Sequence, residues 1–162
     1  MLDALAIITR VISEHRSIRE HVKLAGDTVN DMEALLTLQD ANAGWTQSSM
    51  GALSEKQDRV RQAISFLDEG LKNHFAFEED TLTPLFGDLL MKAVLQEHHE
   101  ISRKIESAKT ILTSLKFEEL EQRELLFKKS QMREMVSGIR QVVEEHAQHE
   151  QTILDMMKKA LE

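Results

Sequence analysis

Four long amphipathic patterns cover most of this 162-residue chain, and each of them predicts a helix. Apolar residues recur at intervals of three and four, which places them on one face of a helix that turns by about 100° per residue. No stretch shows the alternation of apolar and polar residues that is typical of a strand. The predicted inner stripes are Ile8, Val11, Ile12, Ile18, Val22, Val29 and Leu36; Val60, Ala63, Ile64, Leu67 and Leu71; Met91, Val94, Leu95, Ile101, Ile105 and Leu112; and Met132, Met135, Ile139, Val142, Val143, Ile153 and Met157. Long amphipathic helices joined by short connections predict an all-α fold, an antiparallel up-down four-helix bundle.

The predicted helices are separated by residues that favour turns. The segment 40–53 lacks periodicity and is predicted to be a loop, and Ser54 followed by Gln57 is the capping-box signature of a second helix. Phe86-Gly87-Asp88 interrupts the chain again, with Asp88 as a candidate N-cap for the third helix. The four helices are therefore expected over about residues 3–39, 54–82 and 89–115, and from the acidic segment 118–121 to about residue 161.

The composition excludes several classes of protein. A formal net charge of -8 argues against a surface that binds nucleic acid or anionic membranes. The absence of Cys excludes disulfides, thiolate metal sites and cysteine nucleophiles. No apolar run approaches the roughly 20 residues that cross a bilayer, and the N-terminus lacks the basic start of a signal peptide. We expect one cytoplasmic domain over residues 1–162.

Each predicted helix places one histidine near the middle of its apolar stripe. These four are His15, His74, His98 and His146. A single inward His is more often a hydrogen-bonded core residue than a ligand. Four imidazoles buried without a shared partner, however, would leave several nitrogens unsatisfied, at roughly 1–3 kcal/mol each. A common metal removes that cost, and His149 or His99 is held in reserve as a fifth ligand.

Two carboxylates strengthen the prediction of a metal site. Glu78 follows His74 by four residues, and Glu150 follows His146 by four, so each His and Glu share one face of a helix. The spacing alone is weak evidence in a Glu-rich chain, and the specificity comes from spacing and inward facing together. A buried carboxylate is costly unless it is paired or bound to a metal.

The first half of the chain echoes the second. Glu14-His15-Arg16-Ser17-Ile18 corresponds to Glu97-His98-His99-Glu100-Ile101, and each motif precedes a His-x-x-x-Glu helix. A bundle with this repeat has an approximate two-fold axis, which suits a dinuclear site bridged by two carboxylates. Four imidazoles and two carboxylates without thiolate suit iron, manganese or zinc. Two octahedral ions have about twelve coordination positions, and about two of these stay open once an oxo or hydroxo bridge is counted with the six side chains.

The order of these residues resembles that of the hemerythrin-like, or HHE cation-binding, family. The likeness runs from about Leu2 to Met157 and includes the local sequence Asn-His-Phe-Ala-Phe-Glu-Glu-Asp around His74. It implies a four-helix bundle around a non-haem centre of two iron ions with an oxo or hydroxo bridge. It further implies terminal ligands and bridging ligands, which are respectively His15, His74, His98 and His146, and Glu78 and Glu150.

The chain departs from the oxygen-carrying members of that family at two places. Those carriers have a further His four residues after the third-helix His, where this chain has Ser102 after His98, or Arg103 if counted from His99. Their fourth-helix carboxylate is an Asp five residues after its His, whereas Glu150 comes four after. The chain thus resembles the divergent HHE branch, which includes proteins of iron handling, iron–sulfur cluster repair and response to O₂ or NO. Ferritin-like di-iron sites need Glu-x-x-His, and no His of this chain has Glu three residues before it.

Residues beside the second-helix motif complete the predicted site. The aromatic rings of Phe75, Phe77 and Phe86 are expected to wall the site or its end and so restrict solvent access. Glu79 lies about 140° from His74 around the helix and is expected to be solvated.

Three functions are compatible with these patterns, and the sequence leaves the choice among them open. The first is the binding or sensing of O₂ or NO at an open di-iron site. The second is iron-dependent redox catalysis, for example with peroxide, or iron storage, iron donation or iron–sulfur cluster repair. The third is a structural or interaction bundle with vestigial ligands. Enzymatic activity, a protein partner and a homo-oligomeric state are left open as well.

Overall fold

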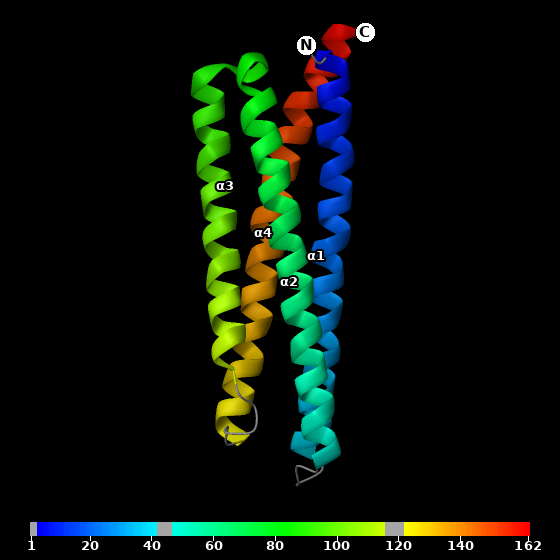
Figure 1. The fold of residues 1–162 in the computed structure, drawn as a ribbon, viewed down its shortest axis with the longest axis vertical. Helices are drawn as coiled ribbons and strands as arrows, with labels where there is room; N and C mark the ends of the chain where they lie inside the picture. The colour runs from blue at the N-terminus through cyan, green and yellow to red at the C-terminus, as the bar shows by residue number, and fades with distance from the viewer. Residues whose placement is uncertain (1–2, 42–46, 116–121) are drawn as a thin grey trace.

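The computed structural model describes residues 3–41, 47–115 and 122–162. These residues include no strand and form four helices, α1 (Ala4–Ala41), α2 (Gln47–Thr81), α3 (Thr83–Ser114) and α4 (Gln122–Leu161). The helices run side by side along the long axis, and both termini lie at the same end (Figure 1). Each helix contacts the next one along the chain, and α4 contacts α1. The predicted all-α, up-down four-helix bundle is confirmed.

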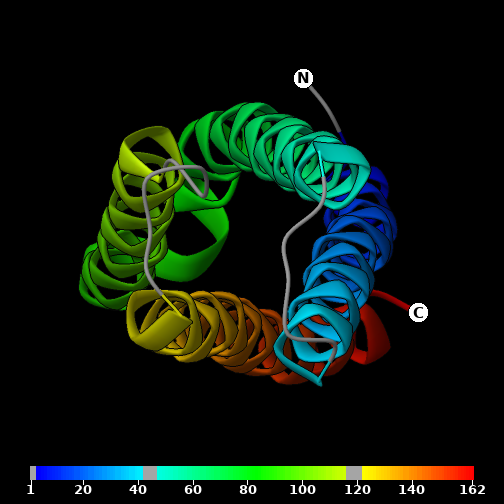
Figure 2. The same cartoon turned by 90° about the horizontal axis from the view of Figure 1, so that it is seen from below.

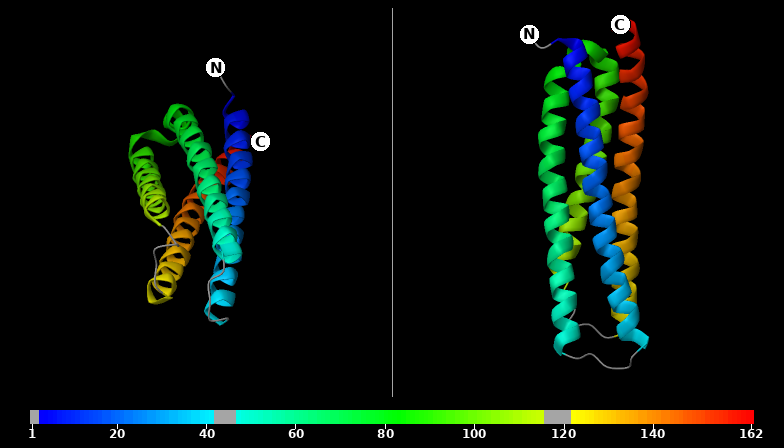
Figure 3. Two further views of the ribbon diagram at one scale, coloured as in Figure 1. Left: turned by 60° about the horizontal axis from the view of Figure 1, so that its bottom comes forward. Right: turned by 90° about the vertical axis from the view of Figure 1, so that its right-hand side faces the viewer.

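The interior of the bundle holds two apolar clusters with a polar layer between them. Seen along the axis of the bundle, the helices are arranged as a ring (Figure 2), and from the side they run lengthwise beside one another (Figure 3). On α1, His15 follows Val11 of the cluster near the termini and precedes Ile18 of the larger cluster. Burying one such aliphatic side chain contributes about 1.5–3 kcal/mol to the free energy of unfolding. The two clusters therefore hold the helices together on both sides of the polar layer. Over the part of the chain that is described, no helix is long and apolar enough to cross a membrane.

The predicted start of α2 was wrong. The helix begins at Gln47, so the second half of the predicted 40–53 loop is helical, and Ser54 lies inside the helix instead of at its cap. Residues 42–46 lie outside the described part of the chain. Most polar residues destabilise a helix by only about 0.7 kcal/mol or less each relative to Ala, so the absence of an apolar stripe does not prevent a helix from forming. A helix can therefore extend beyond its apolar stripe.

One predicted core residue was also wrong. Leu95 is 38% exposed, because the buried stripe of α3 passes through its neighbour Val94 and then His98. The other predicted core residues are buried or half-buried, except Leu36, whose side chain lies outside the described residues.

The corner between α2 and α3 depends on one glycine. Gly87 has φ 77° and ψ 167°, which interrupts α3 near its start. This conformation is nearly restricted to glycine because it lacks a Cβ. Before the interruption, the backbone N–H groups of Leu85 and Phe86 donate to the carbonyl of the fully buried Leu82, at 2.9 and 2.8 Å. The regular part of α3 thus starts at Asp88, close to its predicted start.

The far end of α3 is held by side chains of α2. The amide of Gln57 donates to the carbonyls of Leu112 and Leu115 at 3.0 and 2.9 Å, which satisfies groups that a helix end otherwise leaves open. Farther along this seam, the buried Asp68 accepts from the Lys109 ammonium group. Burial by itself raises the pKa of Asp68, but the neighbouring ammonium groups lower it below its ordinary value. These contacts fix the C-terminal part of α3 against α2.

We predict that Gly87→Ala lowers the free energy of unfolding by about 1–3 kcal/mol, the cost of holding a Cβ-bearing residue in this backbone region. Thermal or urea unfolding measures the change. Gly70→Ala is the matched control, because a Cβ at either glycine would meet open space and only Gly87 has positive φ. Equal effects of the two substitutions would contradict the assignment of strain to Gly87.

Candidate metal centre

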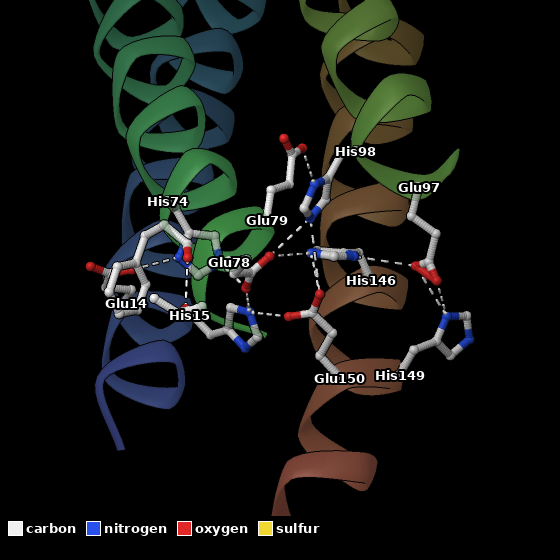
Figure 4. Close-up of polar contacts among 12 residues, drawn as sticks. Glu14, His15, His74, Glu78, Glu79, Glu97, His98, His146, His149 and Glu150 are labelled. Carbon is white, nitrogen blue, oxygen red and sulfur yellow. Dashed lines mark hydrogen bonds and ion pairs between the residues drawn. The ribbon is translucent and has the colours of Figure 1, made fainter. Parts of the chain in front are cut away.

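The polar layer contains all six residues predicted as metal ligands. Each helix contributes one imidazole, and α2 and α4 each add a carboxylate, so that the side chains meet on the bundle axis (Figure 4). The six residues are His15, His74, Glu78, His98, His146 and Glu150, and none is more than 3% exposed. One ligand atom from each of five of them lies within 4.8 Å of the others, and Glu78 contacts the sixth, His98. The fold therefore converges six nitrogen and oxygen donors on one small volume.

Glu78 faces both sides of this volume. Its Oε1 lies 3.2 Å from Nε2 of His15 and 2.6 Å from Nε2 of His74. Its Oε2 lies 2.9 Å from Nε2 of His98 and 3.7 Å from Nε2 of His146. The four imidazoles thus divide into a first pair, His15 and His74, and a second pair, His98 and His146, with one oxygen of Glu78 toward each.

Glu150 divides in the same way. Its Oε2 lies 3.1 Å from Nε2 of His15, in the first pair. Its Oε1 lies 3.3 Å from Nε2 of His146 and 4.0 Å from Nε2 of His98, in the second pair. Two carboxylates that each turn one oxygen to each imidazole pair have the arrangement of bridges between two cations.

Several buried atoms of the centre lack hydrogen-bond partners among the described residues. Four of them face the centre, namely Nε2 of His74 and His146 and both oxygens of Glu150, and the fifth is Nδ1 of His15, whose Nε2 faces the centre instead. Some of these atoms are close to one another without hydrogen-bond geometry, as expected of donors that point at a common third atom. Leaving such groups unsatisfied costs about 1–3 kcal/mol each. Divalent cations that prefer imidazole and carboxylate would satisfy the four atoms that face the centre, so the residues fit the predicted metal site.

The charges of the centre also favour a cation. Burial by itself lowers the pKa of His146, but the neighbouring carboxylates of Glu78, Glu97 and Glu150 raise it to about 10. Burial raises the pKa of Glu78, yet the surrounding imidazoles bring it well below its usual range. The pKa of Glu150 stays raised, by burial and by the negative charge of Glu78. Cations between the two carboxylates would remove their mutual repulsion.

Three imidazoles are held from outside by carboxylates of neighbouring helices. Nδ1 of His74 donates to Glu14 at 2.7 Å, Nδ1 of His98 to Glu79 at 2.9 Å, and Nδ1 of His146 to Glu97 at 3.3 Å. An ionised carboxylate only accepts, so Nδ1 carries a proton in each of these three rings, and Nε2 faces the centre. We call Glu14, Glu79 and Glu97 the outer carboxylates. Such partners orient a ligating imidazole and raise its basicity.

One aromatic ring lies directly against the centre. Phe75 stacks on His98 with ring centroids 3.8 Å apart and meets His146 edge-on at 5.6 Å. Phe77 and Phe86 instead pack into the apolar cluster near the termini, where Arg10 covers the Phe77 ring at 3.6 Å. The predicted aromatic wall is therefore confirmed, with Phe75 at the site and the other two at its end.

The model of the family described as hemerythrin HHE cation binding domain matches residues 6–157. The chain belongs to the hemerythrin HHE cation-binding family. The matched range of this HHE domain contains all six buried ligand candidates, and the buried His/Glu cluster is compatible with a cation site. Searches of curated proteins and of solved structures found no significant match.

Two sequence interpretations of this HHE domain need correction. Glu79 is not simply solvated, because its side chain is 44% exposed yet bonded to His98. The side chain of His149 is 64% exposed and its Nδ1 donates to Glu97 at 2.8 Å, so it lies outside the centre. His99 is also exposed. Neither His is in place to act as a fifth ligand.

The roles of Glu14 and Glu97 were missed, although both residues stood out as parts of the internal repeat. Each precedes the His of its own helix by one residue and bonds the His of the next helix. A repeated Glu-His dipeptide before a His-x-x-x-Glu helix was the signal that could have identified them.

We predict that divalent cations stabilise the HHE domain through this centre. A cation at about 100 times its dissociation constant adds about 2.7 kcal/mol to the free energy of unfolding. Chelator-treated protein should therefore melt at a lower temperature than protein resupplied with Fe²⁺ under anaerobic conditions. Glu78→Gln should remove most of the increase, while the exposed Glu69→Gln on the same helix should keep it. If the ligands are vestigial, Fe²⁺ should raise the melting temperature of neither the parent protein nor the two variants.

Proposed function

We propose that the HHE domain holds two non-haem iron ions and binds O₂ or NO there. The observation that carries this proposal is that Glu78 and Glu150 each turn one oxygen to the first imidazole pair and one to the second. A single cation would need only one oxygen of each carboxylate and only one of the two imidazole pairs. Manganese and zinc suit the same donors, and iron is favoured here by the family resemblance. A pair of iron ions with open positions supplies the ability to bind a small diatomic molecule.

The residues of the chain would hold the ions and leave space between them. Six ligands, two of them bridging, fill about eight of roughly twelve positions around two octahedral ions. Ser102 stands where oxygen carriers have a further His, so each pair keeps two imidazoles. About four positions are then available to a small bridge and to an exchangeable ligand. This arrangement favours an open centre.

The surroundings would keep bulk water away from the bound ions. Apolar clusters lie on both sides of the polar layer, and Phe75 covers the second pair. A dry environment favours uncharged diatomic ligands over hydrated anions and slows the loss of the ions to solvent. The centre is thus suited to selecting small neutral molecules.

We expect protein made with added iron to contain about two iron ions per chain, one for each imidazole pair. Absorption in the near ultraviolet should accompany them, and NO added to the reduced protein should produce new visible bands. Glu150→Ala should lower the iron content and abolish the bands, whereas Gln148→Ala, at an exposed position of the same helix, should not. Less than half an iron ion per chain in the parent protein would refute the proposal.

Iron donation or redox turnover is the second candidate function, and one observation favours it. A pocket of about 180 Å³ between α1 and α2 is lined by Gly70, Glu14 and His74, so it approaches the outer side of one imidazole of the first pair. A chelator or reductant could act through it. Rapid transfer of iron to a coloured chelator, or steady consumption of peroxide, would support this function. Stable reversible binding of O₂ without turnover would argue against it.

A further inference from the structure

His15 differs from the other three imidazoles in its outer contacts. His74, His98 and His146 each donate from Nδ1 to an outer carboxylate. Nδ1 of His15 is buried and has no hydrogen-bond partner among the described residues. The second imidazole pair is therefore supported on both rings, and the first pair on one only.

The internal repeat locates the missing partner. Glu79 on α2 accepts a hydrogen bond from the His of the next helix, α3, and it follows the His of its own helix by five residues. The equivalent step leads from α4 to α1, and five residues after His146 stands Gln151. The amide of Gln151 donates to Asp155 at 3.0 Å, along its own helix. An uncharged side chain thus occupies the place from which a carboxylate would support His15.

The other step of the repeat is intact. Glu14 on α1 supports His74 on α2, and Glu97 on α3 supports His146 on α4. Glu97 also accepts from His149, but mainly with its other oxygen, Oε1, at 2.8 Å. One carboxylate can serve both rings because it has two oxygens. Among the positions that supply an outer carboxylate to an imidazole, the two halves of the centre consequently differ at one, Gln151.

We propose that the two cation positions are unequal, with tighter binding between His98 and His146 than between His15 and His74, and that Gln151 sets the difference. Loss of a carboxylate behind a ligating imidazole typically lowers metal affinity by about 10–100-fold. The second position therefore fills first, and the first position exchanges its cation more readily. This inference rests on the proposed dinuclear centre, in which Gln151 is a positioning residue that acts through His15.

The order of filling can be measured with Zn²⁺, which has no redox chemistry of its own. Chelator-treated protein is titrated in competition with a fluorescent zinc chelator. The parent protein should bind two Zn²⁺ ions with dissociation constants at least about tenfold apart. His15→Ala should keep the tight step and lose the weak one, and His98→Ala should do the reverse. Circular dichroism and melting of each variant verify that the bundle has folded.

The role of Gln151 is tested by a gain of affinity. Gln151→Glu should tighten the weaker step about tenfold and leave the stronger step unchanged. Gln148→Glu is the matched control, with the same change of charge at an exposed position on the same helix, and it should alter neither step by more than twofold. Glu79→Gln should weaken the stronger step. A tightening by both α4 variants alike would reveal a general effect of charge and overturn the role of Gln151.

The outcomes separate this inference from the function on which it rests. A normal iron content with two equal Zn²⁺ affinities would overturn the inequality alone. Unequal affinities that Gln151→Glu does not change would overturn the part assigned to Gln151. An iron content below the limit given above would refute the dinuclear centre, and the inference with it.

Discussion

The structure depends on six polar side chains buried in the middle of an apolar bundle. Glu78 is completely buried and faces imidazoles from all four helices. Burying these side chains separately would destabilise the fold, since each buried polar group without a partner costs about 1–3 kcal/mol of folding free energy. Bringing them together turns that cost into mutual satisfaction, and a pair of cations would complete it. The polar layer therefore restricts how the helices can slide or rotate, because any shift in register separates donors from acceptors.

The outer carboxylates extend this restriction around the ring. Each of them leaves one helix and binds an imidazole on the next, so that α1 is tied to α2, α2 to α3, and α3 to α4. The apolar clusters on either side supply cohesion but little orientation, because hydrophobic attraction has no preferred direction. Hydrogen bonds supply the direction. In this way the imidazole rings are aimed at the centre by contacts made outside it.

The step from α4 to α1 is the exception. There the chain has Gln151, and the imidazole of His15 lies buried without an outer acceptor among the described residues. The internal repeat is thus interrupted among the outer contacts, while each half of the chain keeps two inner imidazoles and one inner carboxylate. A centre of this kind can hold two chemically similar cations with unequal strength.

The six inner residues could be identified from periodicity, because facing inward on a helix is a local property that spacing reveals. The bundle class followed from the same periodicity. Contacts between helices could not be read in this way. Glu79 lies off the apolar stripe of α2 yet points at His98 of α3, and the exposure of Leu95 likewise depends on where its neighbours lie. Which oxygen faces which imidazole, and which imidazole lacks support, was established when four helices packed into one ring, since these contacts join residues far apart in the chain.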